Sequence, residues 1–279
     1  MPLFRHVTDR VRKHAAVALL LACCASAGAF QPVPDMAVLY STHVDRRLAV
    51  EPAEVGLYAR LAEEALAHAG VTPVAAQYLV VVDRNPRVQA LFLLFRPTEG
   101  AVQLVGASPV STGQPGRFDH FETPLGVFDH TLQNPDFRAE GTLNSQGIRG
   151  YGARGMRVYD FGWQPAMRGW GKGGMSEMRL QMHATDPDLL EGRLGSAQSK
   201  GCIRIPASLN RLLDHYGLLD ADYEQGLHDG RTLRVLDAGR EPVPFPGRYL
   251  IVVESRRQDR PDWSPGPFLA PRKRMSPAR

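Results

Sequence analysis

Cys202 and His183 have the residue types of a nucleophile and its base. Cys23 and Cys24 fall inside an N-terminal segment that has the pattern of an export signal, so Cys202 has no disulfide partner in the exported protein. A free thiol with a pKa near 8.5 is only about 3% thiolate at pH 7. A histidine at hydrogen-bond distance can take the thiol proton and later protonate a leaving amine. The sequence therefore predicts a nucleophile at Cys202 and a general acid and base at His183.

Both residues are expected at the ends of strands. In the run 177–183 the even positions are apolar and the odd ones polar, the pattern of a strand with one buried face, which puts His183 on its solvent or cleft side. The same alternation turns Ile203 and Ile205 inward. Cys202 and Arg204 should then share the opposite face.

The residues around the thiol can also position it. Gly201 lets the backbone turn sharply, so the N–H groups of Gly201 and Cys202 could bind a developing oxyanion, with Ser199 and Lys200 as supporting residues. A helix that begins at Pro206 and ends at Gly217 would complete a strand, turn and helix that hold Cys202 rigidly.

The N-terminus predicts export. Basic residues among the first 13 precede an uncharged run, 15–25, that is too short to span a bilayer, and small residues at 27–29 favour cleavage before Phe30. The predicted signal peptide is therefore 1–29 and the destination the periplasm or cell envelope. The alternative is lipid attachment at Cys23.

Hydrophobic periodicity divides the rest of the chain. Residues 30–76 form an N-terminal extension with one amphipathic helix over 52–70, and 77–254 form the main domain. Strands are expected at 78–82, 88–95, 102–110, 127–128, 178–182, 233–236 and 249–253, the first two as a hairpin. Many short strands with few helices predict a mainly-β fold, either a sandwich or a barrel.

Two segments do not fit this pattern. The glycine-rich stretch 141–175 has neither a helical nor a strand period, which predicts an insertion that either closes over a substrate or is a surface excursion. The basic, proline-rich tail 255–279 predicts disorder. The tail could adhere to cell wall or membrane surface, or could only keep the protein in solution.

Two ordered motif blocks give the chain a family resemblance. His183, a spacer, and Ser199-Lys200-Gly201-Cys202-Ile203-Arg204 resemble the catalytic motif of the L,D-transpeptidase (YkuD-type) family, and the stretches 110–113 and 123–128 resemble an upstream family block. The resemblance covers roughly 77–236. It departs from the family pattern at Lys200, where histidine is usual, and at Ala184, where glycine is common.

The resemblance implies a β-sandwich-like cysteine enzyme that acts on peptidoglycan stem peptides. Cys202 would attack the carbonyl at the L-centre of diaminopimelate and release D-alanine, with His183 as base and then acid. The acyl group would pass to an amine, forming a cross-link, or to water, as in an L,D-carboxypeptidase. Arg204 would hold the loop or a substrate carboxylate, and Lys200 could lower the thiol pKa.

Other function classes are less well supported by the sequence. A catalytically weak peptidoglycan-binding protein is the alternative from a different class, because Lys200 replaces the usual histidine. No cofactor or metal is expected: His120 and His130, near Glu122 and Asp129, lack the spacing of a zinc site and are expected at the surface. Arg154 and Trp170 are expected as solvated loop residues. An exported protein would seldom meet nucleic acid.

Overall fold

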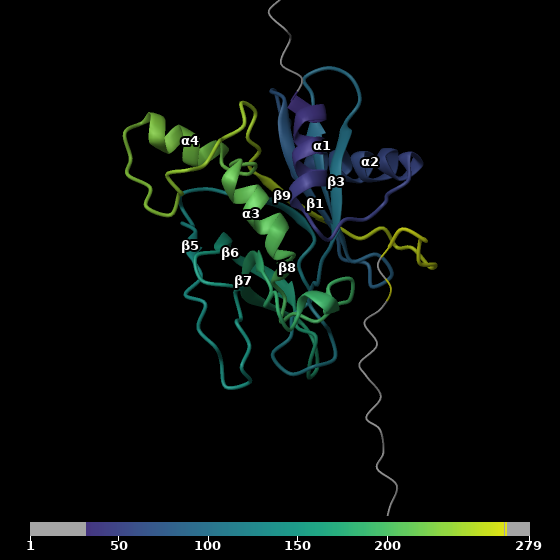
Figure 1. The fold of residues 1–279 in the computed structure, drawn as a ribbon. Helices are drawn as coiled ribbons and strands as arrows, with labels where there is room; N and C mark the ends of the chain where they lie inside the picture. The colour runs from purple at the N-terminus through teal and green to yellow at the C-terminus, as the bar shows by residue number, and fades with distance from the viewer. Residues whose placement is uncertain (1–31, 265, 267–279) are drawn as a thin grey trace, which may run out of the picture. The chain divides into compact units, whose positions relative to one another are not determined.

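The computed structural model describes residues 32–264 and 266. The predicted signal peptide, with Cys23, and the end of the predicted tail lie outside the described residues. Figure 1 shows the elements, which follow in the order α1 (Pro32–His43), α2 (Pro52–His68), β1 (Gln77–Asp83), β2 (Ala90–Arg96), β3 (Gln103–Pro109), β4 (Gly126–Asp129), β5 (Phe137–Arg138), β6 (Arg157–Met167), β7 (Met175–Ala184), a 3-10 turn (Glu191–Arg193), β8 (Ile203–Ile205), α3 (Ala207–His215), α4 (Ala221–His228) and β9 (Tyr249–Val253).

The strands form two open sheets. The first has the order β3-β2-β1-β9-β4 and the second the order β5-β6-β7-β8. Each is mixed, because β1 and β9 are parallel in the first sheet and β7 and β8 are parallel in the second. The prediction of a mainly-β fold with few helices is confirmed, and neither sheet closes into a barrel.

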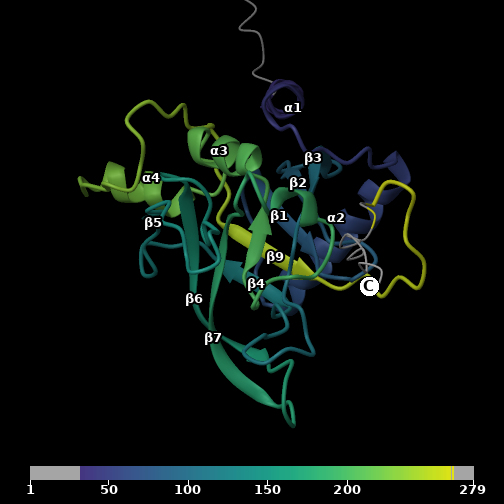
Figure 2. The ribbon, with the colours of Figure 1, turned by 60° about the horizontal axis from the view of Figure 1, so that its bottom comes forward.

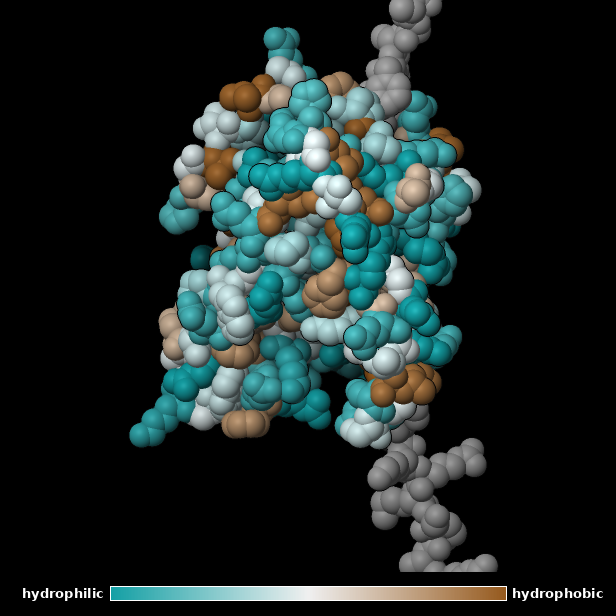
Figure 3. Space-filling view, turned by 90° about the vertical axis from the view of Figure 1, so that its left-hand side faces the viewer, coloured by the Kyte–Doolittle hydropathy of each residue, from teal (hydrophilic) through white to brown (hydrophobic). Residues whose placement is uncertain are grey.

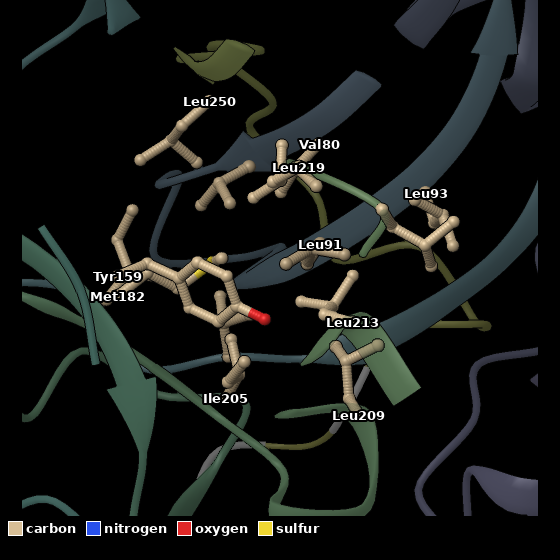
Figure 4. Close-up of a cluster of buried hydrophobic side chains, with 14 of the residues drawn as sticks. Val80, Leu91, Leu93, Tyr159, Met182, Ile205, Leu209, Leu213, Leu219 and Leu250 are labelled. Carbon is tan, nitrogen blue, oxygen red and sulfur yellow. The ribbon is translucent and has the colours of Figure 1, made fainter. Parts of the chain in front are cut away.

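One core lies between the two sheets. It joins β1 and β2 of the first sheet, through residues such as Val80 and Leu91, to β6, β7 and β8 of the second, through Tyr159, Met182 and Ile205. Figure 4 shows these side chains converging with leucines of α3. Alternation on β7 and β8 supplies this core with every second residue, so the remaining residues of these strands point to the opposite face of the second sheet.

A second core covers the other face of the first sheet. Tyr58 of α2 is fully buried there and stacks on Phe92 of β2, with ring centroids 3.7 Å apart. Trp263 packs edge-on against the same two rings. The expectation that the tail is disordered from residue 255 is therefore wrong over 255–264, because the indole of Trp263 completes this apolar cluster.

Several expected elements need correction. The 78–95 hairpin and the helix from Pro52 are confirmed. No strand forms at 233–236, which lies in coil and turns. Part of the glycine-rich stretch forms β6. A bulge shifts the register of this strand between Asp160 and Trp163, which interrupts the alternation of apolar and polar residues by which a strand is recognised in the sequence.

The helix α1 was not expected. The ring of its Tyr40 lies directly against the backbone of Gly106 in β3, where any side chain larger than that of glycine would collide with it. The Tyr40 hydroxyl is 2.5 Å from Ser108 Oγ. Both N-terminal helices belong to the same compact unit as the sheets.

Within residues 32–264 no helix has the length and apolar character that a membrane crossing requires. Figure 3 shows one face of the molecule, on which hydrophobic residues lie in small groups among hydrophilic ones.

Candidate active site

β7 and β8 are neighbouring strands, and they carry the two predicted catalytic residues at or next to their ends. Figure 1 labels both strands, and Figure 2 shows β6 and β7 of the same sheet side by side. The parallel register pairs Met182 with Ile203 and His183 with Arg204. One step back along both strands, Gln181 lies beside Cys202. Ile203 is fully buried in the core between the sheets, whereas Cys202 is only partly buried. Arg179, Gln181, His183 and Cys202 therefore share the face turned away from the core, here called the thiol face.

Hydrogen bonds close the loop that carries the thiol. Ser199 Oγ accepts from the Gly201 N–H at 3.0 Å and donates to the Cys202 carbonyl at 2.5 Å. Gly201 has φ +131°, a conformation open to glycine, and a Cβ there would lie 2.6 Å from Met178 Sδ. Ser199 thus fixes the turn. The Gly201 N–H is already engaged, which corrects the expectation that it is free to bind an oxyanion.

The upstream motif block packs directly against this loop. Ser111 pairs antiparallel with Arg204, through backbone hydrogen bonds of 3.0 and 2.9 Å. The hydroxyl of Thr123 accepts from the Gly113 N–H at 2.9 Å and donates to the Gly201 carbonyl at 2.7 Å. Two sequence blocks about 80 residues apart are therefore joined at the turn before the thiol.

The environment of the thiol favours its neutral form. Burial raises the pKa of Cys202, and the carboxylate of Asp160 adds to the increase. A hydrogen bond from the Gln181 backbone and the charge of Arg204 act in the opposite direction. The Sγ atom lies 3.7 Å from the Arg179 carbonyl oxygen, a suitable acceptor for the S–H. The resting site therefore holds a thiol.

His183 is buried, with 4% of its surface exposed, although alternation placed it on the solvent or cleft side. The ring of Tyr151 covers it edge-on, with centroids 4.7 Å apart. Burial lowers the pKa of His183 to about 4, and the nearby charge of Arg204 acts in the same direction. Its Nδ1 is 2.7 Å from the Ala184 carbonyl oxygen. A carbonyl only accepts, so Nδ1 carries the hydrogen and Nε2 has the lone pair.

Lys200 makes an exposed ion pair. Its ammonium group pairs with Asp119 at 2.6 Å, and both side chains are more than half exposed. Lys200 is not among the groups that shift the pKa of the thiol, which are Arg204, Asp160 and the Gln181 backbone, so its expected effect on that pKa stays a prediction. Arg204 itself donates to the Gln198 carbonyl at 3.3 Å, which ties it to the loop.

A polar network on the thiol face was missed in the sequence. Asp160 of β6 is 1% exposed and accepts from Arg179 Nε and Gln181 Nε2, each at 2.8 Å. Tyr151 donates to Gln181 Oε1 at 3.0 Å. The polar positions 179, 181 and 183 of β7 were the available signal. Their partners come from the glycine-rich stretch, whose fold the sequence did not reveal.

The remaining candidates fall outside the site. His130 was expected at the surface but is fully buried, with Nε2 2.9 Å from Asp136. Arg154 is exposed, and Trp170 is partly buried against Phe121, with centroids 4.8 Å apart. Among the described residues no group of His, Cys, Asp or Glu side chains could hold a metal ion.

No protein-family model matches the chain, and a search of curated proteins finds no match.

Proposed function

We propose that the protein is an exported cysteine acyltransferase, an L,D-transpeptidase with the sandwich-like catalytic domain of that family, that acts on peptidoglycan stem peptides. The proposal joins the family resemblance of the two motif blocks to the chemistry of the thiol face. Cys202 is the nucleophile and His183 the general acid and base. Neither a cofactor nor a metal takes part in the proposed steps.

The observation that carries the proposal is the meeting of the upstream motif block with the cysteine motif at one turn. Thr123 bonds to Gly113 and Gly201, and Ser199 bonds to Gly201 and Cys202. A buried cysteine with a purely structural role needs no such hydrogen-bonded turn. A turn fixed at this many points holds a nucleophile in one geometry, as acyl transfer requires.

The first half of the reaction forms a thioester. Cys202 Sγ attacks the carbonyl carbon at the L-centre of the diaminopimelate residue while its proton passes to His183 Nε2. We assign the Cys202 N–H as a donor to the oxyanion, because Ser199 engages that of Gly201. The C–N bond then breaks, and the imidazolium returns the proton to the departing amine of D-alanine.

The second half regenerates the thiol. An amine of a neighbouring stem attacks the thioester carbonyl, His183 takes a proton from that amine, and Sγ leaves with the proton that His183 returns. With water in place of the amine, the same steps give carboxypeptidase activity. The amine as acceptor is the proposed main reaction.

Incubation of the protein with disaccharide tetrapeptides, followed by mass spectrometry, tests the proposal. We expect cross-linked dimers or loss of D-alanine with the wild type, and neither with Cys202→Ala. A carbapenem should form a covalent adduct on Cys202. Equal turnover by the wild type and Cys202→Ala would overturn the assignment of the nucleophile.

A binding protein with the same fold is the second candidate. It is favoured by the resting site, in which burial raises the pKa of the thiol and lowers that of His183, and Tyr151 covers the imidazole. Absence of any product or carbapenem adduct from the wild type, together with retention of Cys202→Ala on isolated sacculi, would favour this function over catalysis.

A further inference from the structure

We propose that Arg179 binds the terminal carboxylate of the acyl donor and so selects donors whose scissile bond lies one residue from a free carboxyl end. This inference rests on the proposed function and names a specificity-determining residue within it. Three features of the thiol face support it: the position of Arg179, its anchor, and its unused hydrogen-bond donors.

Arg179 is the residue of β7 whose backbone reaches the thiol. Its carbonyl oxygen lies 3.7 Å from Cys202 Sγ. Its side chain occupies the polar side of β7, on the same face as Gln181 and His183. The backbone of Arg179 therefore lies next to the nucleophile, and its side chain extends on the thiol face, from which a substrate can approach.

A buried carboxylate fixes the guanidinium. Arg179 Nε donates to Asp160 Oδ2 at 2.8 Å, and Gln181 Nε2 donates to the same oxygen at 2.8 Å. The other oxygen, Asp160 Oδ1, accepts from the Gly162 N–H at 2.8 Å. Asp160 is 1% exposed, so its partners hold it in one position. An arginine held through Nε loses less freedom when its other nitrogens bind a ligand.

The terminal nitrogens of Arg179 remain available. Within the described part of the chain, its guanidinium makes a side-chain hydrogen bond only through Nε, and 42% of the side chain is exposed. Two parallel N–H groups form the planar fork that suits a carboxylate. Asp160 offsets part of the positive charge but occupies neither terminal nitrogen. The two terminal nitrogens of Arg179 are therefore suited to bind a carboxylate.

The proposed placement also predicts which donors are selected. One residue of extended peptide spans about 3.5 Å, so the terminal carboxylate of the departing residue lies about that far beyond the scissile carbonyl. A donor extended by a further residue would carry its carboxylate past Arg179, and an amidated donor would lose the charge. A free acid at this one distance should therefore be preferred.

Binding to inactive protein tests this without catalysis. On the Cys202→Ala background, calorimetry should show that a tetrapeptide stem with a free carboxyl end binds more tightly than its C-terminal amide. Adding Arg179→Gln should weaken binding of the acid by about 10- to 100-fold, the range for loss of a charged hydrogen-bonding partner, and leave binding of the amide unchanged. Arg179→Lys should keep part of the preference.

Turnover supplies the second readout. In the wild type, kcat/KM should favour the acid over the amide, and Arg179→Gln should reduce that ratio toward one. Arg168→Gln is the matched control, because it removes an exposed arginine just after β6 and should leave the ratio unchanged. Circular dichroism of each variant checks that the fold is kept.

The outcomes separate this inference from the proposed function. A wild type that forms the acyl-enzyme equally well with acid and amide overturns the role of Arg179 alone. Equal losses on acid and amide in Arg179→Gln also overturn it, because they indicate only a structural contribution through Asp160. The third outcome is that the wild type forms no acyl-enzyme while Cys202→Ala still shows an acid preference that depends on Arg179. This outcome contradicts the catalytic proposal and supports carboxylate binding by Arg179.

Discussion

At the scale of single residues, the site rests in a neutral form. Burial raises the pKa of Cys202 and lowers that of His183, so the thiol face of the free protein holds a neutral thiol and an uncharged imidazole. A neutral imidazole can accept a proton at pH 7, whereas a preformed thiolate and imidazolium pair would already have transferred it. The proton of Cys202 is therefore expected to pass to His183 as the thiol attacks the carbonyl. The positive charge of Arg204 favours the thiolate during this step.

His183 should make the fold sensitive to acid. Its pKa is about 4 in the folded protein and near 6.5 when exposed, so between these values the unfolded chain binds a proton that the folded chain does not. The free energy of unfolding should then fall as the pH is lowered through this window, by up to about 3 kcal/mol. Urea titrations from pH 7.5 to 4 measure this.

His183→Asn is the control for the acid response, because asparagine cannot take up the proton but can still donate to the Ala184 carbonyl. The difference between wild type and variant isolates this group from His130, whose pKa is raised by Asp136 and whose contribution to stability is lost as the pH rises. Parallel stability curves for the two proteins would contradict the low pKa of His183.

At the scale of elements, the segment between β5 and β6 covers His183, the proposed general acid and base. Tyr151 lies between Phe137 and His183, with centroid distances of 5.5 and 4.7 Å, and its hydroxyl bonds to Gln181. A pocket beside this cover, lined by residues including Glu140, Thr142 and Gly150, has about 460 Å³ of free space. This pocket gives the Tyr151 side chain space into which it can move, and such a movement would expose the imidazole of His183.

Removing the cover should raise the pKa of His183. Tyr151→Ala admits water to the imidazole, which weakens the desolvation that lowers the pKa, and the value should move from about 4 toward 6.5. Tyr151→Phe keeps the ring and should leave it low. NMR titration of the imidazole Hε1 resonance measures the shift. An unchanged pKa in Tyr151→Ala would show that other residues bury His183.

Local patterns in the sequence predicted part of this arrangement. Alternation placed Ile203 and Ile205 in the core and Cys202 on the other face, because neighbouring residues decide which side of a strand is apolar. The cover over His183 could not be predicted, since Tyr151 is 32 positions away and reaches it only in the folded chain. The role of Asp160 could not be predicted for a related reason, because the bulge that follows it breaks the alternation by which β6 would be recognised as a strand.

At the scale of the whole molecule, a buried ionic cluster joins the second sheet to the C-terminal helices. Arg157 of β6 is fully buried and donates to Asp136 at 2.6 Å and to Asp220 at 2.8 Å. The rings of Tyr159 and Tyr223 lie 4.9 and 4.8 Å from its guanidinium carbon. No sequence pattern indicated this cluster, because its members are charged residues far apart in the chain.

Arg157→Met should destabilise the fold strongly. It removes the guanidinium that bonds to the buried carboxylates of Asp136 and Asp220, and loss of one partner of a buried pair costs about 3–5 kcal/mol. Urea denaturation should show a clearly lower midpoint. Arg154→Met, which changes an exposed arginine nearby, should keep the wild-type midpoint. Equal midpoints in the two variants would mean that the cluster adds no net stability.

The place of β9 in the first sheet constrains when this protein can fold. β9 is the last strand of the described residues, yet it lies between β1 and β4, and Trp263 beyond it completes the core under α2. An emerging chain cannot join β4 to β1 until β9 has arrived, so the sheet stays incomplete during most of synthesis. Such a connectivity delays folding, and in a protein exported as proposed this delay would keep the polypeptide competent for passage through a narrow secretion channel.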